Sequence, residues 1–204
     1  MTTEKILENS IILSIKRSEE RANLRLNYFK KNNIDARIWY GYDGAITGLQ
    51  TDFLYEIDNP NYKIGAKTVN MALSHYSIWQ YANFAKLSTC AIFEDDACFV
   101  TNWKNILDEN IKHLPDDWDL FFIGSCSCMS YPNKIHIKEN LYKTDHVLCS
   151  HAYIINNTAY ETLLKYQKIW APIDIALTLG PVKELNTYAL FPTVIKQDGN
   201  ELID

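Results

Sequence analysis

The sequence alternates short apolar runs with longer segments in which apolar residues recur at helical spacing. The apolar runs have the length of buried strands: residues 10–15, 36–40, 89–93, 119–124, 151–155 and 188–191. The segments between them have capping residues or an apolar helical face: residues 18–29, 69–86, 103–114 and 158–169, with a short helix after Pro172. This alternation predicts an α/β layered fold with a mostly parallel sheet. Such folds bind ligands beyond the carboxyl ends of their strands, so functional residues are expected there.

Residues 45–67 follow neither pattern. They contain Gly48, the pair Asn59-Pro60 and Gly65, which predict a long irregular loop. A helix over residues 51–57 is the alternative. Loops of this length in compact domains are often functional.

The composition excludes several classes of protein. A chain of 204 residues with 47% hydrophobic and 22% charged residues is typical of one globular domain, here residues 1–204. Its net charge of −5 gives no reason to expect nucleic acid or an anionic membrane as the main partner. We expect no transmembrane segment and no signal peptide, because no apolar run approaches the roughly 20 residues of a membrane span and the N-terminus is polar.

The five cysteines are an odd number and show no paired CxxC spacing. The sequence therefore predicts neither a disulfide framework nor a zinc site. Cys126 and Cys128 are expected to be small, buried or half-buried residues where a strand leads into a loop. A cytoplasmic, reducing compartment is the simplest expectation.

Three consecutive acids, Glu94, Asp95 and Asp96, follow a run of apolar residues with the length of a buried strand. Side chains alternate along extended chain, so Glu94 and Asp96 are expected on one side and Asp95 on the other. Two carboxylates close together at a strand end favour a hard divalent cation such as Mg²⁺ or Mn²⁺, often shared with substrate phosphates. A solvated acidic turn is the alternative.

Basic residues follow the first predicted strand. Lys16 and Arg17 stand at its exit, and Arg21 and Arg25 continue along the next helix. Cations and free N–H groups at a strand-to-helix turn suit a diphosphate, although a solvated basic helix face gives the same pattern.

Two further residues have more than one interpretation. His75 lies on the apolar face of its predicted helix, which favours a hydrogen-bonded core histidine over a ligand. Asp174 follows Pro172 between apolar residues, and it is either a helix-starting acid or a catalytic base.

Taken in order, several segments resemble glycosyltransferase family 25, the lipopolysaccharide-type and collagen galactosyltransferases. Residues 12–21, ILSIKRSEER, are similar to the family's INLKRSxER, and WYGYDG at 39–44 is similar to its aromatic-x-A-x-D-G turn. ALSHYSIW at 72–79, FEDDA at 93–97 and WDL at 118–120 resemble its ALSHxxIW, LEDD and WDLxxLG motifs. HAYII at 151–155 and PID at 172–174 resemble its HAYxIS…PID segment.

This resemblance implies a GT-A-like (Rossmann-like) α/β/α sandwich and inverting transfer of a sugar, usually galactose, from a UDP-sugar to a glycan or hydroxyl acceptor. It implies Mn²⁺ or Mg²⁺ at Glu94 and Asp96, with Asp95 at the ribose or holding the loop. Lys16, Arg17 and Arg21 would contact the donor diphosphate. An inverting enzyme needs one general base, for which Asp174 is the first candidate and His151 the second. An acceptor carried on a lipid would bring the protein into peripheral contact with a membrane.

The chain also departs from the family pattern. Residues 67–71 read KTVNM where the family usually has GEIGC, and no histidine follows His151. These departures favour the alternative of a nucleotide-sugar or glycan-binding protein that has lost turnover. A glycoside hydrolase is a third reading, but adjacent acids at one strand end do not flank a glycosidic bond as that chemistry requires.

Overall fold

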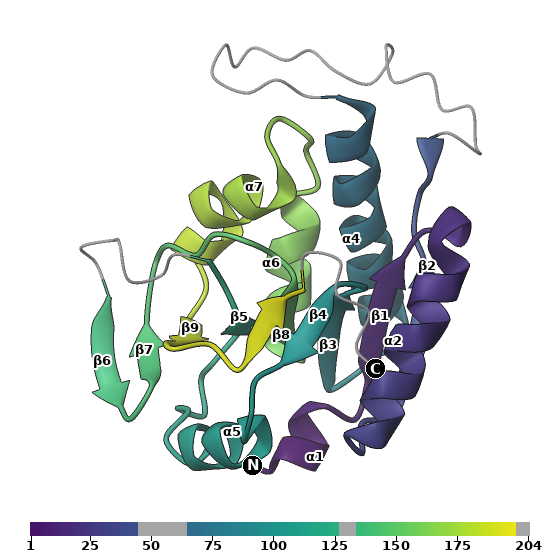
Figure 1. Ribbon diagram of the computed structural model, residues 1–204. Helices are drawn as coiled ribbons and strands as arrows, with labels where there is room; N and C mark the ends of the chain where they lie inside the picture. Colours follow the sequence, from purple (N-terminus) through teal and green to yellow (C-terminus); the bar gives the residue numbers. More distant parts are fainter. Residues whose placement is uncertain (45–64, 127–133, 199–204) are drawn as a thin grey trace.

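The computed structural model describes residues 1–44, 65–126 and 134–198 (Figure 1). Its α-helices are α1 (Thr3–Ile6), α2 (Glu19–Lys31), α4 (Ala66–Phe84), α5 (Trp103–Ile111), α6 (Tyr160–Lys165) and α7 (Ile173–Leu179). Its strands are β1 (Ser10–Ser14), β2 (Ala36–Tyr40), β3 (Thr89–Glu94), β4 (Ala97–Phe99), β5 (Leu120–Gly124), β6 (Ile135–Lys138), β7 (Leu141–Lys143), β8 (Ala152–Asn156), β9 (Thr187–Leu190) and β10 (Ile195–Gln197). Most of the loop predicted at residues 45–67 lies outside the described residues, as does the alternative helix over residues 51–57.

A large mixed sheet forms the centre of the fold, with strand order β2-β1-β3-β8-β5-β9-β7-β6. β1 pairs in parallel with β2 and β3, and β5 pairs in parallel with β9. β8 runs antiparallel between β3 and β5, and β7 runs antiparallel to β9 and β6. Strands β2, β1, β3, β5, β9 and β6 therefore point in one direction, which confirms the predicted mostly parallel α/β sheet.

Helices cover both faces of this sheet, because strand residues alternate between two apolar cores. One core contains Ile12, Phe93, Phe121 and Ile154 from the strands together with buried residues of α2 and α5. The other contains Leu13, Ile92, Phe122 and Tyr153 together with buried residues of α4, α6 and α7. This is the α/β/α layering that the family resemblance implied (Figure 1).

A second, two-stranded sheet pairs β10 with β4, which begins three residues after the end of β3. The backbone N–H of Asp198 also donates to the carbonyl oxygen of Asp96 at 3.0 Å. A segment from near the end of the described chain therefore lies against the acidic turn between β3 and β4. Sequence analysis missed both strands of this sheet.

β5 and β8 come close together where β5 ends at Gly124. A Cβ atom on Gly124 would lie 2.5 Å from His151 Nε2 and 2.9 Å from Ala152 Cβ, so only glycine fits there. The β5–β8 register shifts between Phe122 and Gly124. This irregularity brings the exit of β5 next to the chain that leads into β8.

Two of the cysteine predictions were wrong: the absence of a disulfide and the burial of Cys126. Cys126, just beyond β5, forms a disulfide with Cys149, just before β8, with a Cα–Cα distance of 5.6 Å. Cys126 is exposed rather than buried or half-buried, and Cys128 lies outside the described residues. Disulfides persist in oxidising surroundings, so cysteine usage no longer supports the expected reducing compartment.

Candidate functional site

The three acids lie at the carboxyl end of β3 and have three different environments. Asp95 is buried, whereas Glu94 and Asp96 are partly exposed. All three line a cavity of about 560 Å³ at the carboxyl ends of β1 and β3, referred to below as the larger cavity. The sequence therefore placed these carboxylates correctly at the carboxyl end of a strand, where folds of this class bind ligands.

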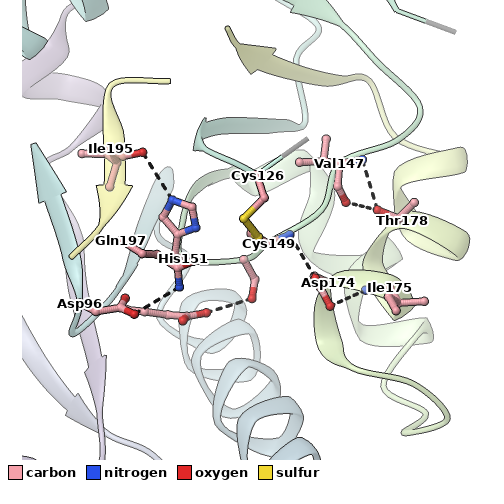
Figure 2. The surroundings of a disulfide bond; sticks show 12 residues. Asp96, Cys126, Val147, Cys149, His151, Asp174, Ile175, Thr178, Ile195 and Gln197 are labelled. Carbon is pink, nitrogen blue, oxygen red and sulfur yellow. Dashed lines mark hydrogen bonds between the residues drawn. A yellow bond between two sulfur atoms is a disulfide. The ribbon is translucent and has the colours of Figure 1, made fainter. Parts of the chain in front are cut away.

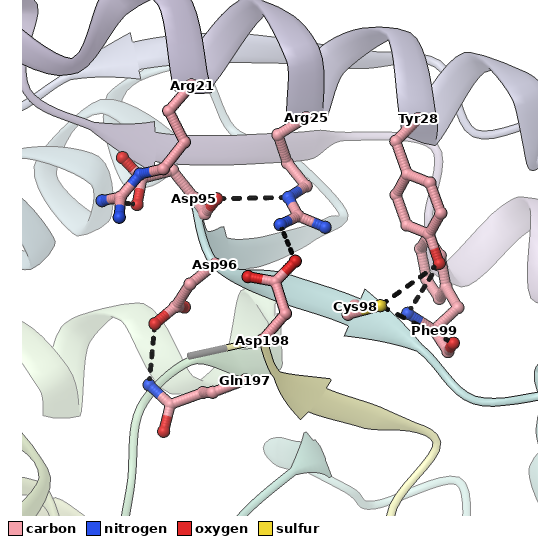
Figure 3. Close-up of polar contacts among 9 residues, drawn as sticks. All are labelled: Arg21, Arg25, Tyr28, Asp95, Asp96, Cys98, Phe99, Gln197 and Asp198. Carbon is pink, nitrogen blue, oxygen red and sulfur yellow. Dashed lines mark hydrogen bonds and ion pairs between the residues drawn. The ribbon is translucent and has the colours of Figure 1, made fainter. Parts of the chain in front are cut away.

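Asp95 is held by residues of the neighbouring strand and helix. Its carboxylate accepts a hydrogen bond from the Ser14 hydroxyl and pairs with the Arg21 guanidinium. Its backbone oxygen accepts a hydrogen bond from Arg25 Nε at 3.1 Å, and Arg25 also pairs with Asp198 (Figure 3). This buried network fits the loop-holding role of Asp95 better than contact with a ribose, although Asp95 also lines the larger cavity.

Asp96 has one oxygen without a partner. Its Oδ2 accepts a hydrogen bond from Gln197 Nε2 at 3.2 Å (Figure 3), whereas its buried Oδ1 accepts none from the described residues. Burial and the nearby negative charges of Glu94 and Asp95 raise the pKa of Asp96 to about 6. A cation bound beside Asp96 would stabilise the charged form of this carboxylate.

Glu94 faces α4 and the chain that precedes β8. Its Oε1 accepts a hydrogen bond from Ser150 Oγ at 3.0 Å and lies 3.7 Å from His75 Nε2. Burial alone raises the pKa of Glu94, but His75 and Ser150 outweigh it, and the pKa lies below its usual value. Glu94 is therefore ionised at neutral pH.

His75 is a core residue, as its position on the helix predicted. Its Nδ1 lies 2.8 Å from the hydroxyl of Tyr153, which also accepts a hydrogen bond from Trp79 Nε1 at 2.9 Å. The side chain is fully buried. This network fixes the imidazole behind Glu94 rather than presenting it to the cavity.

The predicted donor-binding cations divide into two groups. Arg17 and Arg21 line the larger cavity, and Arg17 Nε lies 3.0 Å from Asp43 Oδ2. Lys16 instead pairs with Glu19 and lies over the ring of Tyr40, 4.8 Å from its centroid. Lys16 is absent from the lining of the larger cavity, so the structure gives its predicted donor contact no support.

A smaller cavity of about 260 Å³ adjoins the larger one. The two share four lining residues: Lys67, Met71, Glu94 and Gln197. Asp174, in the first turn of α7, lines the smaller cavity. Its Oδ2 accepts a hydrogen bond from the backbone N–H of Cys149 at 3.1 Å, and its Oδ1 accepts one from Ile175 at 2.9 Å (Figure 2).

His151 lies behind this site and lines neither of the two cavities. It is 3% exposed, and its Nε2 lies 3.4 Å from the carbonyl oxygen of Ile195 (Figure 2). Burial lowers the pKa of His151, so the ring is neutral at pH 7. Of the two candidate bases, the structure brings only Asp174 to a cavity wall.

The sequence matches the family described as "Glycosyltransferase family 25 (LPS biosynthesis protein)" over residues 7–178. The chain belongs to glycosyltransferase family 25. The matched region contains β1, the acidic turn and Asp174, and it includes every lining residue of both cavities except Gln197.

Curated members of family 25 resemble this chain over part of its length. A human protein named "inactive glycosyltransferase 25 family member 3" is 28% identical over 124 residues, covering 55% of this chain and 21% of the relative. Human procollagen galactosyltransferase 2 is 27% identical over 124 residues, covering 55% of this chain and 20% of the relative. The chain thus matches about a fifth of the length of these family members.

A solved structure shares the fold. The crystal structure of A197 from STIV superposes with a TM-score of 0.51 at 11% identity, covering 95% of this chain and 87% of that chain. At this identity the likeness concerns the fold alone. No helix in the described part of this family 25 chain is long and apolar enough to cross a lipid bilayer.

The residues present fit the divalent cation that family 25 membership implies. Asp96 offers a buried oxygen that has no partner within residues 1–44, 65–126 and 134–198, and Glu94 offers an ionised carboxylate on the same cavity wall. Only Cys126, Cys149 and His151, among the described residues, have three ligand atoms within 4.8 Å of one another, and the two cysteines are joined in a disulfide. The protein would thus supply two carboxylates, and donor phosphates and water would supply the remaining oxygens.

Sequence reasoning missed several residues of this family 25 site. Lys67 and Gln197 line both cavities, and Asn70 lines the larger one with a buried Oδ1 that has no partner among the described residues. Ser150, whose hydroxyl group donates a hydrogen bond to Glu94, is another residue that the sequence did not indicate. The replacement of the family's glycine-containing lead by residues 67–71 was the only signal that pointed to Lys67 and Asn70.

Proposed function

We propose that this chain is a metal-dependent, inverting glycosyltransferase that moves a sugar from a UDP-sugar to a hydroxyl group of a glycan. The observation that carries the proposal is the pair of adjoining cavities that share Glu94. The larger one holds the carboxylates and cations suited to a nucleotide diphosphate, and the smaller one adds Asp174, a carboxylate suited to a general base. Galactose is the first candidate for the sugar, because a relative is named procollagen galactosyltransferase 2.

The larger cavity would bind the donor. Arg17, Arg21 and Lys67 carry positive charge on its wall, where they would face the diphosphate. Glu94 and Asp96 would hold Mn²⁺ or Mg²⁺, and the ion would supply positive charge against the departing UDP. Asp95, fixed by Ser14 and Arg21, keeps the acidic turn in place for both tasks.

The smaller cavity would bind the acceptor, with Asp174 as the base. As the acceptor oxygen attacks the anomeric carbon, Asp174 takes the hydroxyl proton, a new C–O bond forms and the bond to UDP breaks on the opposite face. Both Asp174 oxygens already accept one backbone N–H bond, and each keeps further acceptor capacity. The backbone bonds orient the carboxylate, which is what a positioned base requires.

Calorimetric titration of UDP and UDP-galactose, in Mn²⁺ and in chelator, tests this function. We expect binding that requires the metal, followed by sugar transfer to a glycan acceptor in the same buffer. Binding of neither ligand by the folded protein would reject the donor assignment.

A turnover-deficient binding protein is the second candidate. Two observations favour it: residues 67–71 lack the glycines of the family's usual lead, and four relatives are named inactive or probable inactive. Turnover decides between the candidates, since metal-dependent UDP-sugar binding without hydrolysis or transfer to any of a panel of glycans would establish the binding protein.

A lipid-linked glycan is part of the same proposal. Such an acceptor would bring the protein into peripheral contact with a membrane surface. Co-sedimentation with vesicles that contain a glycolipid, compared with vesicles that lack it, tests this contact. Equal binding to both would reject a glycan-directed contact.

A further inference from the structure

Residues 147–151, called the bridging segment below, connect the candidate base to the candidate metal site. The backbone N–H of Cys149 donates to Asp174, and the hydroxyl of the next residue, Ser150, donates to Glu94. The backbone N–H of Val147 donates to Thr178 Oγ1 on α7 at 3.2 Å, and that hydroxyl donates to the Val147 carbonyl oxygen (Figure 2). One short stretch of chain thus contacts the functional carboxylates of both cavities.

The disulfide fastens the middle of this segment to the central sheet. It joins Cys149 to Cys126, two residues beyond the end of β5, and the Cys126 N–H donates to the carbonyl oxygen of Leu148 at 3.1 Å. Cys149 has a φ of 69°, a left-handed conformation that is unfavourable for residues with a Cβ. Contacts around Cys149 must therefore maintain this backbone conformation. The disulfide is a covalent bond among these contacts.

This disulfide is accessible from solvent. Cys126 is exposed, and Cys149 is half-buried and lines the smaller cavity. Cys90 and Cys98 are free thiols on β3 and β4, and Cys90 is fully buried. A soluble thiol can therefore reach the Cys126 sulfur without disturbing the core.

We propose that the Cys126–Cys149 disulfide is a redox switch that sets the position of Asp174 relative to Glu94 and so controls the acceptor cavity. The link to catalysis rests on the transferase function proposed above. The reductant is a dithiol: its thiolate attacks Cys126 Sγ, and Cys149 leaves as a thiolate and takes up a proton. The second thiol of the reductant then closes its own disulfide and releases Cys126, so two electrons and two protons pass to the protein.

Reduction would release only one of the attachments of the bridging segment. Its hydrogen bonds to Glu94 and Thr178 remain available, but the strained Cys149 backbone is free to relax. Relaxation would withdraw the Cys149 N–H, which is one of the two backbone donors that orient Asp174. The larger cavity keeps its cations and the Arg21–Asp95 pair, which do not depend on the segment.

Amide hydrogen exchange, followed by mass spectrometry, tests the switch without reference to turnover. The wild type is compared in its oxidised form and after dithiothreitol, alongside the Cys126→Ser/Cys149→Ser variant and a Cys98→Ser control. Upon reduction we expect at least about tenfold faster exchange in residues 147–151 and in α7, with β1 and α2 unchanged. The double variant should exchange like the reduced wild type, and Cys98→Ser should respond to dithiothreitol as wild type does.

Equal exchange in the oxidised and reduced proteins would overturn the switch. A loss of protection across the whole sheet would also overturn it, since the disulfide would then hold the entire fold rather than this segment.

Turnover tests the link to catalysis. We expect kcat to fall at least about tenfold upon reduction, while the Kd of UDP in Mn²⁺ changes less than about twofold. A kcat that is equal in both forms would overturn the link. If exchange responds but neither form transfers sugar in any assay, the transferase function fails and the control of the bridging segment by the disulfide stands.

Discussion

The larger and smaller cavities adjoin each other, but different interactions fix their walls. The larger cavity is framed by regular strands and helices and is braced by charge pairs, Arg21 with Asp95 and Arg25 with Asp198. The smaller cavity is framed by the short helix α7 and the bridging segment, which are held by a few hydrogen bonds and a disulfide. Strands and helices therefore position the wall of the larger cavity, whereas a short helix and the bridging segment position the wall of the smaller one.

This difference indicates whether substitutions would change recognition at the larger cavity or at the smaller cavity more easily. A charge network between β3, α2 and the chain after β10 cannot lose one member without leaving a buried charge unpaired. A loop fastened by a few bonds tolerates substitution and insertion more readily. We therefore expect donor recognition to be robust and acceptor recognition to be adjustable.

The largest expected effect is on the acceptor side. Asp174→Asn removes the candidate base, so we expect transfer to fall by about 10³-fold, a barrier increase of about 4 kcal/mol. UDP affinity in Mn²⁺, measured by calorimetry, should change less than about twofold. Transfer at the wild-type rate would exclude Asp174 as the base and remove the functional contrast between the two cavities.

Arg25→Leu tests the bracing of the larger cavity. Arg25 is 7% exposed, and its loss leaves Asp198 without its ion pair, so we expect about 3 kcal/mol less free energy of unfolding in urea. The matched control is Lys112→Ala, which breaks the exposed pair with Glu109 and should cost less than about 1 kcal/mol. Equal losses in the two variants would show that the buried network does not brace this wall.

Asp96→Ala tests the metal site within the larger cavity. With the partnerless Oδ1 removed, we expect UDP affinity in Mn²⁺ to weaken by about 100-fold, or about 2.7 kcal/mol, while circular dichroism shows an unchanged fold. Transfer should fall in parallel. Wild-type UDP affinity in this variant would exclude Asp96 as a metal ligand.

The smallest expected effect is a pH dependence of stability. The folded protein raises the pKa of Asp96 to about 6 because of burial and neighbouring acids, so without metal its charge destabilises the fold above that pH. Asp96→Asn should raise the free energy of unfolding by about 1–2 kcal/mol at pH 7.5. The gain should shrink as pH falls through 6 and disappear below about pH 4, where both proteins carry a neutral group. A gain that is constant with pH would point to hydrogen bonding rather than charge.

Sequence patterns predicted the central elements because these are buried and continuous. Residues 36–40 coincide with β2, and residues 89–93 lie within β3, since apolar runs of strand length have few other uses in a globular chain. β6 is exposed along its whole length, and β4 and β10 have only three residues each. β4 and β10 pair with each other across a long separation in sequence, which no local pattern records.

The same distinction applies to the site. Glu94, Asp96 and Asp174 were found because acids that interrupt apolar runs are conspicuous in a sequence. Gln197 reaches Asp96 from 101 positions away, and the disulfide joins cysteines 23 positions apart. Both depend on how strands pair in space, so the exposed Gln197 and the bonded Cys126 could not be recognised from composition or spacing.

The pairing of β10 with β4 has a practical consequence for protein production. Residues 195–198 form part of the acidic turn's support, although they lie about a hundred positions after it in the chain. A truncation that trims this stretch would remove the Gln197 and Asp198 contacts together and would be misread as evidence that the core is unstable. An affinity tag belongs at Met1, which is 62% exposed, because there it leaves the turn and its supporting strand untouched.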